Sequence, residues 1–292
     1  MFYIVLIVFV FILSLCWGSF LNVIAHRIAF NKKIFTKRSI CPHCHNIINW
    51  YDNIPLISFI FLYGKCRHCK KSISILYPVI ELSTAVIITA LFIKFLPSLT
   101  AQYINNINFD NLWNTSNPLF PVYNLSFYTP LQNWSSFILL IIFISALIIS
   151  TRTDLEAMVI PRICTLWLIP VGLLASFFNI LNINITYSFF GAITGYMTLK
   201  IIALLFKYFT KKEGMGEGDM EFLSMIGSFV GPIGVWFTLM LGSILGCIIG
   251  GLYLLIAKKE RFTRIPFGPF LSIGTILFLF FEKTLAKLFL FT

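Results

Sequence analysis

Two aspartates are the first candidates for chemistry. The chain has only four aspartates, and two of them, Asp154 and Asp219, border long apolar runs. Asp154 follows "SALIISTRT", and Asp219 follows "EGMGEG", whose glycines permit close approach of another peptide strand. Twenty residues of helix counted from Trp134 rise roughly 30 Å, which predicts that Asp154 lies at the cytoplasmic boundary of a membrane. An acid at that depth is costly unless it is paired or hydrated, so function is the leading hypothesis.

Two carboxyl groups brought together share one proton, because both cannot ionise cheaply. The ionised group then takes a proton from water while the protonated group polarises a carbonyl, which is the chemistry of an aspartic peptidase. The simpler alternative is that Asp154 and Asp219 are ordinary acids at helix ends. The loop lacks the glycine pattern and the following Lys-Ser/Thr of a phosphate loop, so nucleotide binding is disfavoured.

Four cysteines form a second candidate site. "CPHC" and "CRHC" supply two C-x-x-C pairs, the spacing of a tetrahedral zinc site, with the ligands Cys41, Cys44, Cys66 and Cys69. A reducing cytosol favours zinc over disulfides, and a metal can supply folding energy to so small a domain. The neighbouring histidines, His43, His45 and His68, are interpreted as solvated. The remaining cysteines, Cys16, Cys164 and Cys247, are interpreted as small apolar residues of helices.

The elements that carry these residues belong to a membrane protein. Hydrophobic residues make up 58% of the 292 positions and charged residues 11%, far from the balance of a soluble domain. The fold class predicted is all-α and polytopic, with about eight transmembrane helices and a small cytoplasmic zinc-binding domain between the first and second. The predicted spans are 2–25, 75–96, 135–153, 160–180, 186–209, 219–231, 234–257 and 266–290, and the sixth is short because "GPIG" interrupts it at 231–234.

The basic residues predict the topology. Nine of them lie in 27–71, four in 200–212 and four in 258–264, whereas 96–136 contains none. The positive-inside rule then places the N-terminus outside and these clusters in the cytoplasm. We therefore interpret the net charge of +11 as topology and not as nucleic-acid binding. The predicted regions are a first helix (1–25), a cytoplasmic tetracysteine domain (26–74), a second helix (75–96), an external loop (97–134) and a membrane peptidase core (135–292).

Five segments, in this order, resemble one family. They are "GSFLNVIAHR" (18–27), "CPHC…WYDNIP…GKCRHC" (41–69), "YPVIEL" (77–82), "DLEAMVIP" (154–161) and "GMGEGDMEFL" (214–223). Together they nearly span the chain and are similar to the type IV prepilin peptidases, which are membrane aspartic peptidases and N-methyltransferases. The chain departs from the family pattern at Arg162, where an acid is usual, and at Leu76, where an arginine is common.

The resemblance implies the activity and its partners. The expected substrates are prepilins or pseudopilins, cut after a glycine at the cytoplasmic face of the bacterial inner membrane. S-adenosylmethionine is then the expected donor for methylation of the new N-terminal amine, and membrane lipid is the expected surroundings. By position in the motifs, Asp154 and Asp219 match the catalytic pair, and the four cysteines match the zinc ligands.

Three further hypotheses remain open beside this interpretation. The chain could be a peptidase without methylation, a transporter with the two aspartates as a proton relay, or a zinc-stapled membrane scaffold. Other polar residues have two interpretations each. Glu81 is either functional within the membrane or paired with a base. Asn22, Ser19 and Gly18 either line a pocket or permit helix packing, and Asp52 is either a turn residue before Pro55 or part of the methyltransferase site.

Overall fold

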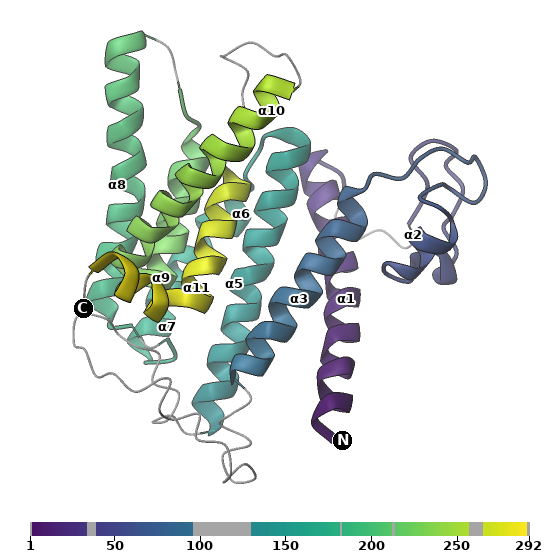
Figure 1. The fold of residues 1–292 in the computed structure, drawn as a ribbon, viewed down its shortest axis with the longest axis horizontal. Helices are drawn as coiled ribbons and strands as arrows, with labels where there is room; N and C mark the ends of the chain where they lie inside the picture. Colours follow the sequence, from purple (N-terminus) through teal and green to yellow (C-terminus); the bar gives the residue numbers. More distant parts are fainter. Residues whose placement is uncertain are drawn as a thin grey trace.

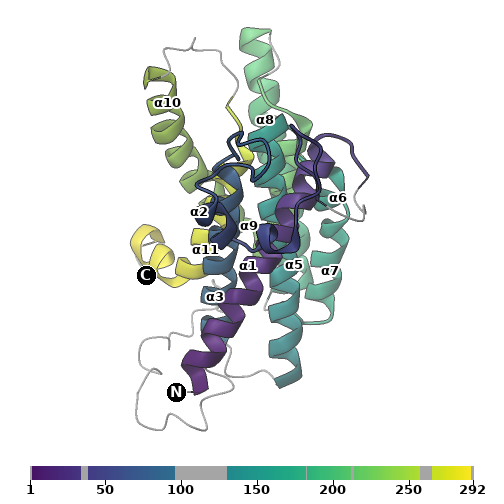
Figure 2. The same cartoon turned by 90° about the vertical axis from the view of Figure 1, so that its right-hand side faces the viewer.

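The computed structural model describes residues 2–33, 39–95, 130–181, 183–211, 214–256 and 265–290, and these residues form a helical protein (Figure 1). Most of the predicted external loop 97–134, with Asp110, lies outside the described residues. The N-terminus lies at one end of the molecule, and the end of α8 and all of α10 lie at the other (Figures 1 and 2).

Five helical stretches are long and apolar enough to cross a membrane. Four are single helices: α1 (Phe2–Ala29), α3 (Leu76–Phe95), α5 (Pro130–Ala157) and α8 (Ile185–Thr210). The fifth is the run Glu217–Ile256, and Arg162–Phe177 and Gly268–Glu282 are shorter apolar stretches. Each of the four single helices covers one predicted span, because apolar length is the signal that both share. The all-helical, multi-pass prediction is confirmed, and the count of eight is not.

The predicted span 160–180 is shorter and broken in the structure. It consists of α6 (Arg162–Thr165) and α7 (Leu168–Phe177). Pro170 lies in the first turn of α7, where its missing N–H costs nothing. A continuous helix from residue 160 would instead place this proline in the interior, where it breaks a hydrogen bond. Pro170 therefore explains why a new helix begins at Leu168.

Helix α9 (Glu217–Leu245) contains the predicted interruption. Its backbone leaves helical geometry at Gly231 (φ 73°, ψ 179°), directly before Pro232. A Cβ placed on Gly227 would lie 2.9 Å from the Val235 side chain, so the chain folds back at this point. After the fold it continues through a π-helical turn (Gly246–Gly250) into α10 (Gly251–Ile256). The predicted spans 219–231 and 234–257 are therefore the two arms of one bent segment.

Glycines let α8 pack closely on the first arm of α9. A Cβ on Gly191 would collide with the backbone of Gly227, and a Cβ on Gly195 would collide with the Leu223 carbonyl. In a membrane, such small residues permit the contact between helices that drives association. On the other side of α9, Phe229 stacks on Phe143 of α5 with ring centroids 4.3 Å apart. Helix α9 is thus held between α8 and α5.

The N-terminal part of the fold packs α1 and α3 against α5, with a small domain beside them (Figures 1 and 2). Gly18 permits close contact of α1 with α3, because a Cβ there would lie 3.0 Å from the Glu81 backbone. This observation supports the packing interpretation of Gly18. The small domain contains a 3-10 helix (Trp50–Asn53) and the short helix α2 (Ile57–Phe61).

Candidate active site and cysteine site

Asp154 lies near the C-terminal end of α5 and is buried, with 5% of its surface exposed. Its Oδ2 accepts a hydrogen bond of 2.9 Å from the backbone N–H of Gly268. Gly268 is the first residue of α11 (Gly268–Leu290), so the carboxylate meets the positive end of that helix. The sequence analysis did not identify Gly268, because its role depends on a contact across 114 positions of the chain.

Asp219 lies in the first turn of α9, which begins after Gly216. Its carboxylate accepts a hydrogen bond from the Gly216 backbone N–H and interacts electrostatically with Asp154. The side chain is partly buried, whereas Gly216 itself is exposed. The structure therefore brings the two predicted aspartates together, one from the end of α5 and one from the start of α9.

Ile160, in the loop after Asp154, lies against the start of α9 and the start of α11. Its side chain lies 3.3 Å from the Cβ position of Gly218 and 3.5 Å from that of Gly268. Because neither glycine has a side chain, the loop after Asp154 can lie directly against the starts of α9 and α11. The apolar side chain reduces access of water to the carboxylates from this side.

Arg162 lies at the outer rim of the same region. Its guanidinium is 3.6 Å from Glu217 Oε2 and 3.5 Å from Glu221 Oε1. Glu221 also accepts a hydrogen bond from Thr165, so α6 is tied to α9 by polar contacts. The Arg162 and Glu217 side chains are 69% and 80% exposed, and an ion pair this exposed contributes little to stability.

The four predicted cysteines come together in the small domain. Their sulfur atoms all lie within 4.8 Å of one another, and the Sγ atoms of Cys41 and Cys69 are 3.9 Å apart. Four sulfurs around a tetrahedral zinc with Zn–S near 2.3 Å would be about 3.8 Å apart. The set therefore fits a metal ion and is compatible with zinc. The three neighbouring histidines are not part of this group of ligand atoms.

Each pair of cysteines sits in a similar turn. The N–H of Cys41 donates to Asn46 and that of Cys66 donates to Lys71, and each turn closes with a residue at positive φ, His45 (56°) or Lys70 (57°). Within the second turn, the N–H groups of Cys69 and His68 lower the pKa of the Cys66 thiol to about 6, whereas, against the Asn46 backbone hydrogen bond, burial and the neighbouring thiols raise the pKa of Cys44 to about 11. At Cys66 the thiolate, which is the metal-binding form, is thereby favoured.

Two acids hold the small domain in place. Asp52 accepts hydrogen bonds from Arg67, with distances of 3.0 and 2.8 Å from Nε, and this pairing raises the pKa of the guanidinium. Arg67 lies between two of the cysteines, so Asp52 clamps the second turn. Glu81, buried in α3, accepts a 2.9 Å hydrogen bond from the N–H of Leu56. Leu56 has φ 58° and ψ −49°, an unfavourable conformation for leucine.

Among the described residues, the recorded hydrogen-bond donors to Glu81 are the Leu56 backbone N–H and the Ser19 hydroxyl, and neither is the base that the sequence interpretation offered as a partner.

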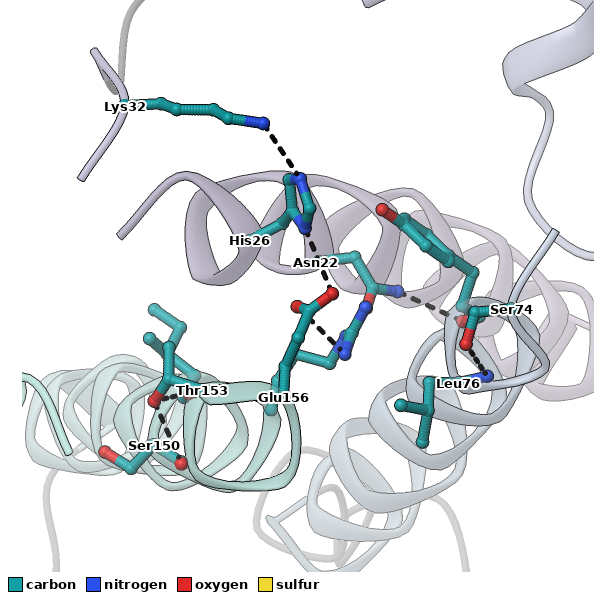
Figure 3. Close-up of polar contacts among 11 residues, drawn as sticks. Asn22, His26, Lys32, Ser74, Leu76, Ser150, Thr153 and Glu156 are labelled. Atoms are coloured by element: carbon teal, nitrogen blue, oxygen red, sulfur yellow. Dashed lines mark hydrogen bonds and ion pairs between the residues drawn. The ribbon is translucent and has the colours of Figure 1, made fainter. Parts of the chain in front are cut away.

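The sequence analysis also missed a buried polar cluster between α1, α3 and α5 (Figure 3). Arg152, only 1% exposed, donates from Nε to Asn22 Oδ1 at 3.2 Å, and its guanidinium lies 5.1 Å from the Tyr77 ring. Its Nη1 is 3.1 Å from Glu156 Oε2, and Glu156 Oε1 is 3.2 Å from His26 Nδ1. The signal that could have predicted this cluster is a charged pair four residues apart near the end of an apolar helix.

These features define a class of protein: a multi-pass helical membrane protein with one carboxylate at the end of one helix, a second at the start of another, and a four-cysteine domain. The comparisons identify the family. The bacterial peptidase A24 N-terminal domain matches residues 12–95, and the type IV leader peptidase family matches residues 141–255. The chain belongs to the type IV leader peptidase family.

Several relatives are similar over nearly their whole length, and each is named prepilin leader peptidase/N-methyltransferase. The protein of Aeromonas hydrophila is 32% identical over 91% of this chain and 87% of its own. The proteins of Stutzerimonas stutzeri and Pseudomonas aeruginosa are 31% and 30% identical, each over 90% of this chain and 86% of their own. No solved structure matches this chain.

Proposed function

We propose that the chain is a prepilin leader peptidase whose catalytic pair is Asp154 and Asp219. The observation that carries the proposal is the electrostatic interaction between the two carboxylates, of which Asp154 accepts the N–H of Gly268. In this mechanism, the ionised aspartate removes a proton from water, and the protonated aspartate donates a hydrogen bond to the scissile carbonyl. The Gly268 N–H fixes one oxygen of Asp154, and Gly216 does the same for Asp219.

The substrate class follows from the names of the relatives, which act on prepilins. The apolar helix of such a substrate would lie in the bilayer, with the scissile bond after glycine at the membrane surface. We place this surface on the cytoplasmic side of the bacterial inner membrane, because the basic residues of 27–71 and 200–212 lie on that side in the predicted topology.

The second proposed activity is N-methylation of the new N-terminal amine. It is supported by the name that the relatives share and by a chain that covers both halves of the family. S-adenosylmethionine, when bound, supplies the methyl group. The four-cysteine site is proposed to hold structural zinc that orders the small domain beside α1 and α3.

The transporter alternative is less well supported. A proton relay through the membrane needs acids spread across its depth, commonly near the midplane of inverted repeats. Asp154 and Asp219 instead lie together, at the end of one helix and the start of another.

The test is incubation of purified protein in lipid with a synthetic prepilin N-terminal segment and S-adenosylmethionine, followed by mass spectrometry. We expect cleavage after glycine and a gain of one methyl group, with both products absent for Asp219→Asn. Asp→Asn removes the charge and keeps the volume, so the variant should remain folded. Cleavage by Asp154→Asn or Asp219→Asn at the wild-type rate would contradict the paired mechanism. Cleavage without methylation would reduce the function to a peptidase.

A further inference from the structure

The polar cluster between α1 and α5 has features that its role in packing does not explain. Arg152 Nη1, Arg152 Nη2 and Glu156 Oε2 are buried and make no hydrogen bond among the described residues. Nη1 and Oε2 are 3.1 Å apart and form an ion pair, but their orientation does not satisfy a hydrogen bond. Buried polar atoms without hydrogen bonds are rare in native proteins and call for an explanation, such as an ordered water, an ion or a catalytic role.

His26 lies at the open edge of this cluster, with 24% of its side chain exposed (Figure 3). Ionised Glu156 can only accept hydrogen bonds, so the 3.2 Å contact assigns the ring proton to His26 Nδ1. In the neutral ring, the other nitrogen, Nε2, then carries a lone pair. It points away from Glu156 toward Lys32 Nζ, 3.4 Å away at the surface. A histidine oriented in this way by a carboxylate is arranged to accept a proton.

The position of the cluster relative to Asp154 is also informative. Asp154 and Glu156 are two residues apart on α5, so their side chains leave the helix about 200° apart. Asp154 contacts Gly268 of α11, whereas Glu156 contacts His26 of α1. The end of α5 thus presents the proposed peptidase site on one face and the His26 cluster on the other. His26 belongs to the first family segment, 12–95, whereas Asp154 and Glu156 both belong to the second, 141–255.

We propose that His26, oriented by Glu156, is the general base of the methylation step; this inference rests on the proposed function. An N-terminal amine is mostly protonated at neutral pH, and the ammonium form has no lone pair to attack a methyl group. His26 Nε2 takes one proton from the ammonium. The neutral amine then attacks the methyl carbon of the sulfonium donor: the N–C bond forms, the C–S bond breaks and the donor leaves as a neutral thioether. The imidazolium returns its proton to water.

The charged and titratable groups around His26 fit this role. Glu156 of α5 faces Nδ1 through Oε1 and stabilises the imidazolium. Its other oxygen, Oε2, forms an ion pair with Arg152. Lys32 faces Nε2 from the chain after α1 and is exposed, so a substrate amine can displace it. Tyr77 of α3 lies against Arg152, whose guanidinium is 5.1 Å from the ring. Arg27 is the neighbouring base on α1 itself.

The experiment separates the two reactions by using two peptides. Cleavage is measured with a full prepilin segment, and methylation is measured with the same segment already lacking its leader, for the wild type and His26→Gln. Glutamine keeps a donor toward Glu156 but cannot accept a proton. About one-tenth of an N-terminal amine is already neutral at pH 7, so we expect methylation to fall roughly tenfold at pH 7 while cleavage is unchanged.

The pH profile distinguishes a base from a structural residue. An N-terminal amine loses its proton near pH 8 without help, so the difference in methylation rate between His26→Gln and the wild type should nearly disappear by pH 9. Addition of imidazole to His26→Ala should restore methylation in part. Glu156→Gln should keep cleavage and slow methylation, because the amide stabilises the imidazolium less than the carboxylate does.

A second measurement does not depend on turnover. Histidine-selective nitrogen NMR of the wild type should show the Nδ1–H form for His26, identified by the signal lost in His26→Gln.

Four results would overturn the inference: methylation by His26→Gln at the wild-type rate, equal loss of cleavage and methylation, a loss that is the same at pH 7 and pH 9, or an Nε2–H form in the wild type. Absence of methylation by the wild type, with cleavage intact, would overturn the methyltransferase function together with this inference. A wild type that methylates and a His26→Gln variant that does so equally well would overturn the inference alone.

Discussion

Asp154 Oδ2 and the backbone N–H of Gly268 are 2.9 Å apart and join the end of α5 to the start of α11. This contact fixes the position of a carboxylate whose partner, Asp219, comes from a third helix. A side chain at position 268 would occupy the space of the carboxylate, because its Cβ would lie 2.9 Å from Oδ2.

The first prediction is therefore that Gly268→Ala slows cleavage. The added methyl group displaces Asp154, and we expect kcat to fall at least tenfold, which corresponds to about 1.4 kcal/mol of transition-state stabilisation. The measurement is cleavage of the prepilin segment by mass spectrometry. Gly251→Ala is the matched control, since a Cβ at that position meets no atom of the other described residues within 4 Å outside its own helix. Equal rates for the two variants would show that Asp154 does not depend on this contact.

The second prediction concerns α8 and α9. Gly191→Ala should lower the thermal stability of the protein in lipid or detergent, because its Cβ would collide with the backbone of Gly227. Overpacking of this kind costs about 1–3 kcal/mol. Gly246→Ala is a suitable control, because its Cβ would make an ordinary contact with Phe270 at 3.4 Å. An unchanged melting temperature for Gly191→Ala would mean that the two helices can separate without loss.

The third prediction concerns metal content. The wild type should carry one zinc per chain, and Cys41→Ser combined with Cys66→Ser should lose it, because one ligand is removed from each turn. Plasma emission spectroscopy of the purified protein gives the ratio directly. Cys16→Ser with Cys247→Ser, which changes two exposed cysteines outside the site, should keep the metal. Full zinc content in the Cys41/Cys66 variant would exclude this site.

The fourth prediction is that Glu81→Gln loosens the attachment of the small domain. A hydrogen bond to a charged acceptor contributes about 1.5–3 kcal/mol, so the Leu56 amide should exchange with solvent roughly tenfold faster or more. Hydrogen exchange of the peptide that contains Leu56 is the measurement. Helices α5 and α9 should exchange as in the wild type. Faster exchange throughout the chain would instead indicate global destabilisation.

The sequence predicted what depends on local pattern. Apolar length located α1, α3, α5 and α8, the "GPIG" segment located the fold-back at Gly231, and the paired spacing located the four cysteines. Contacts between distant residues were not predictable in this way. The Gly268 N–H, which any residue except proline carries, gives no signal in the sequence, and the contact between His26 and Glu156 depends on how α1 meets α5.

The count of eight spans is not confirmed, for a related reason. Hydropathy reports how apolar a segment is, but not whether it runs straight. The run from Glu217 to Ile256 has 40 residues and bends at one glycine, and Arg162–Phe177 divides into two short helices. Both departures are set by single residues, Gly231 and Pro170, whose effects depend on backbone geometry.

The backbone strain at Leu56 acts against its hydrogen bond to Glu81. A leucine at positive φ holds about 1–3 kcal/mol of unfavourable backbone energy, and that energy is returned as soon as the contact opens. The net work of detaching the small domain at this point is therefore smaller than the hydrogen bond alone suggests. Replacement of Leu56 by glycine would remove this backbone strain and make the contact with Glu81 harder to open than in the natural chain.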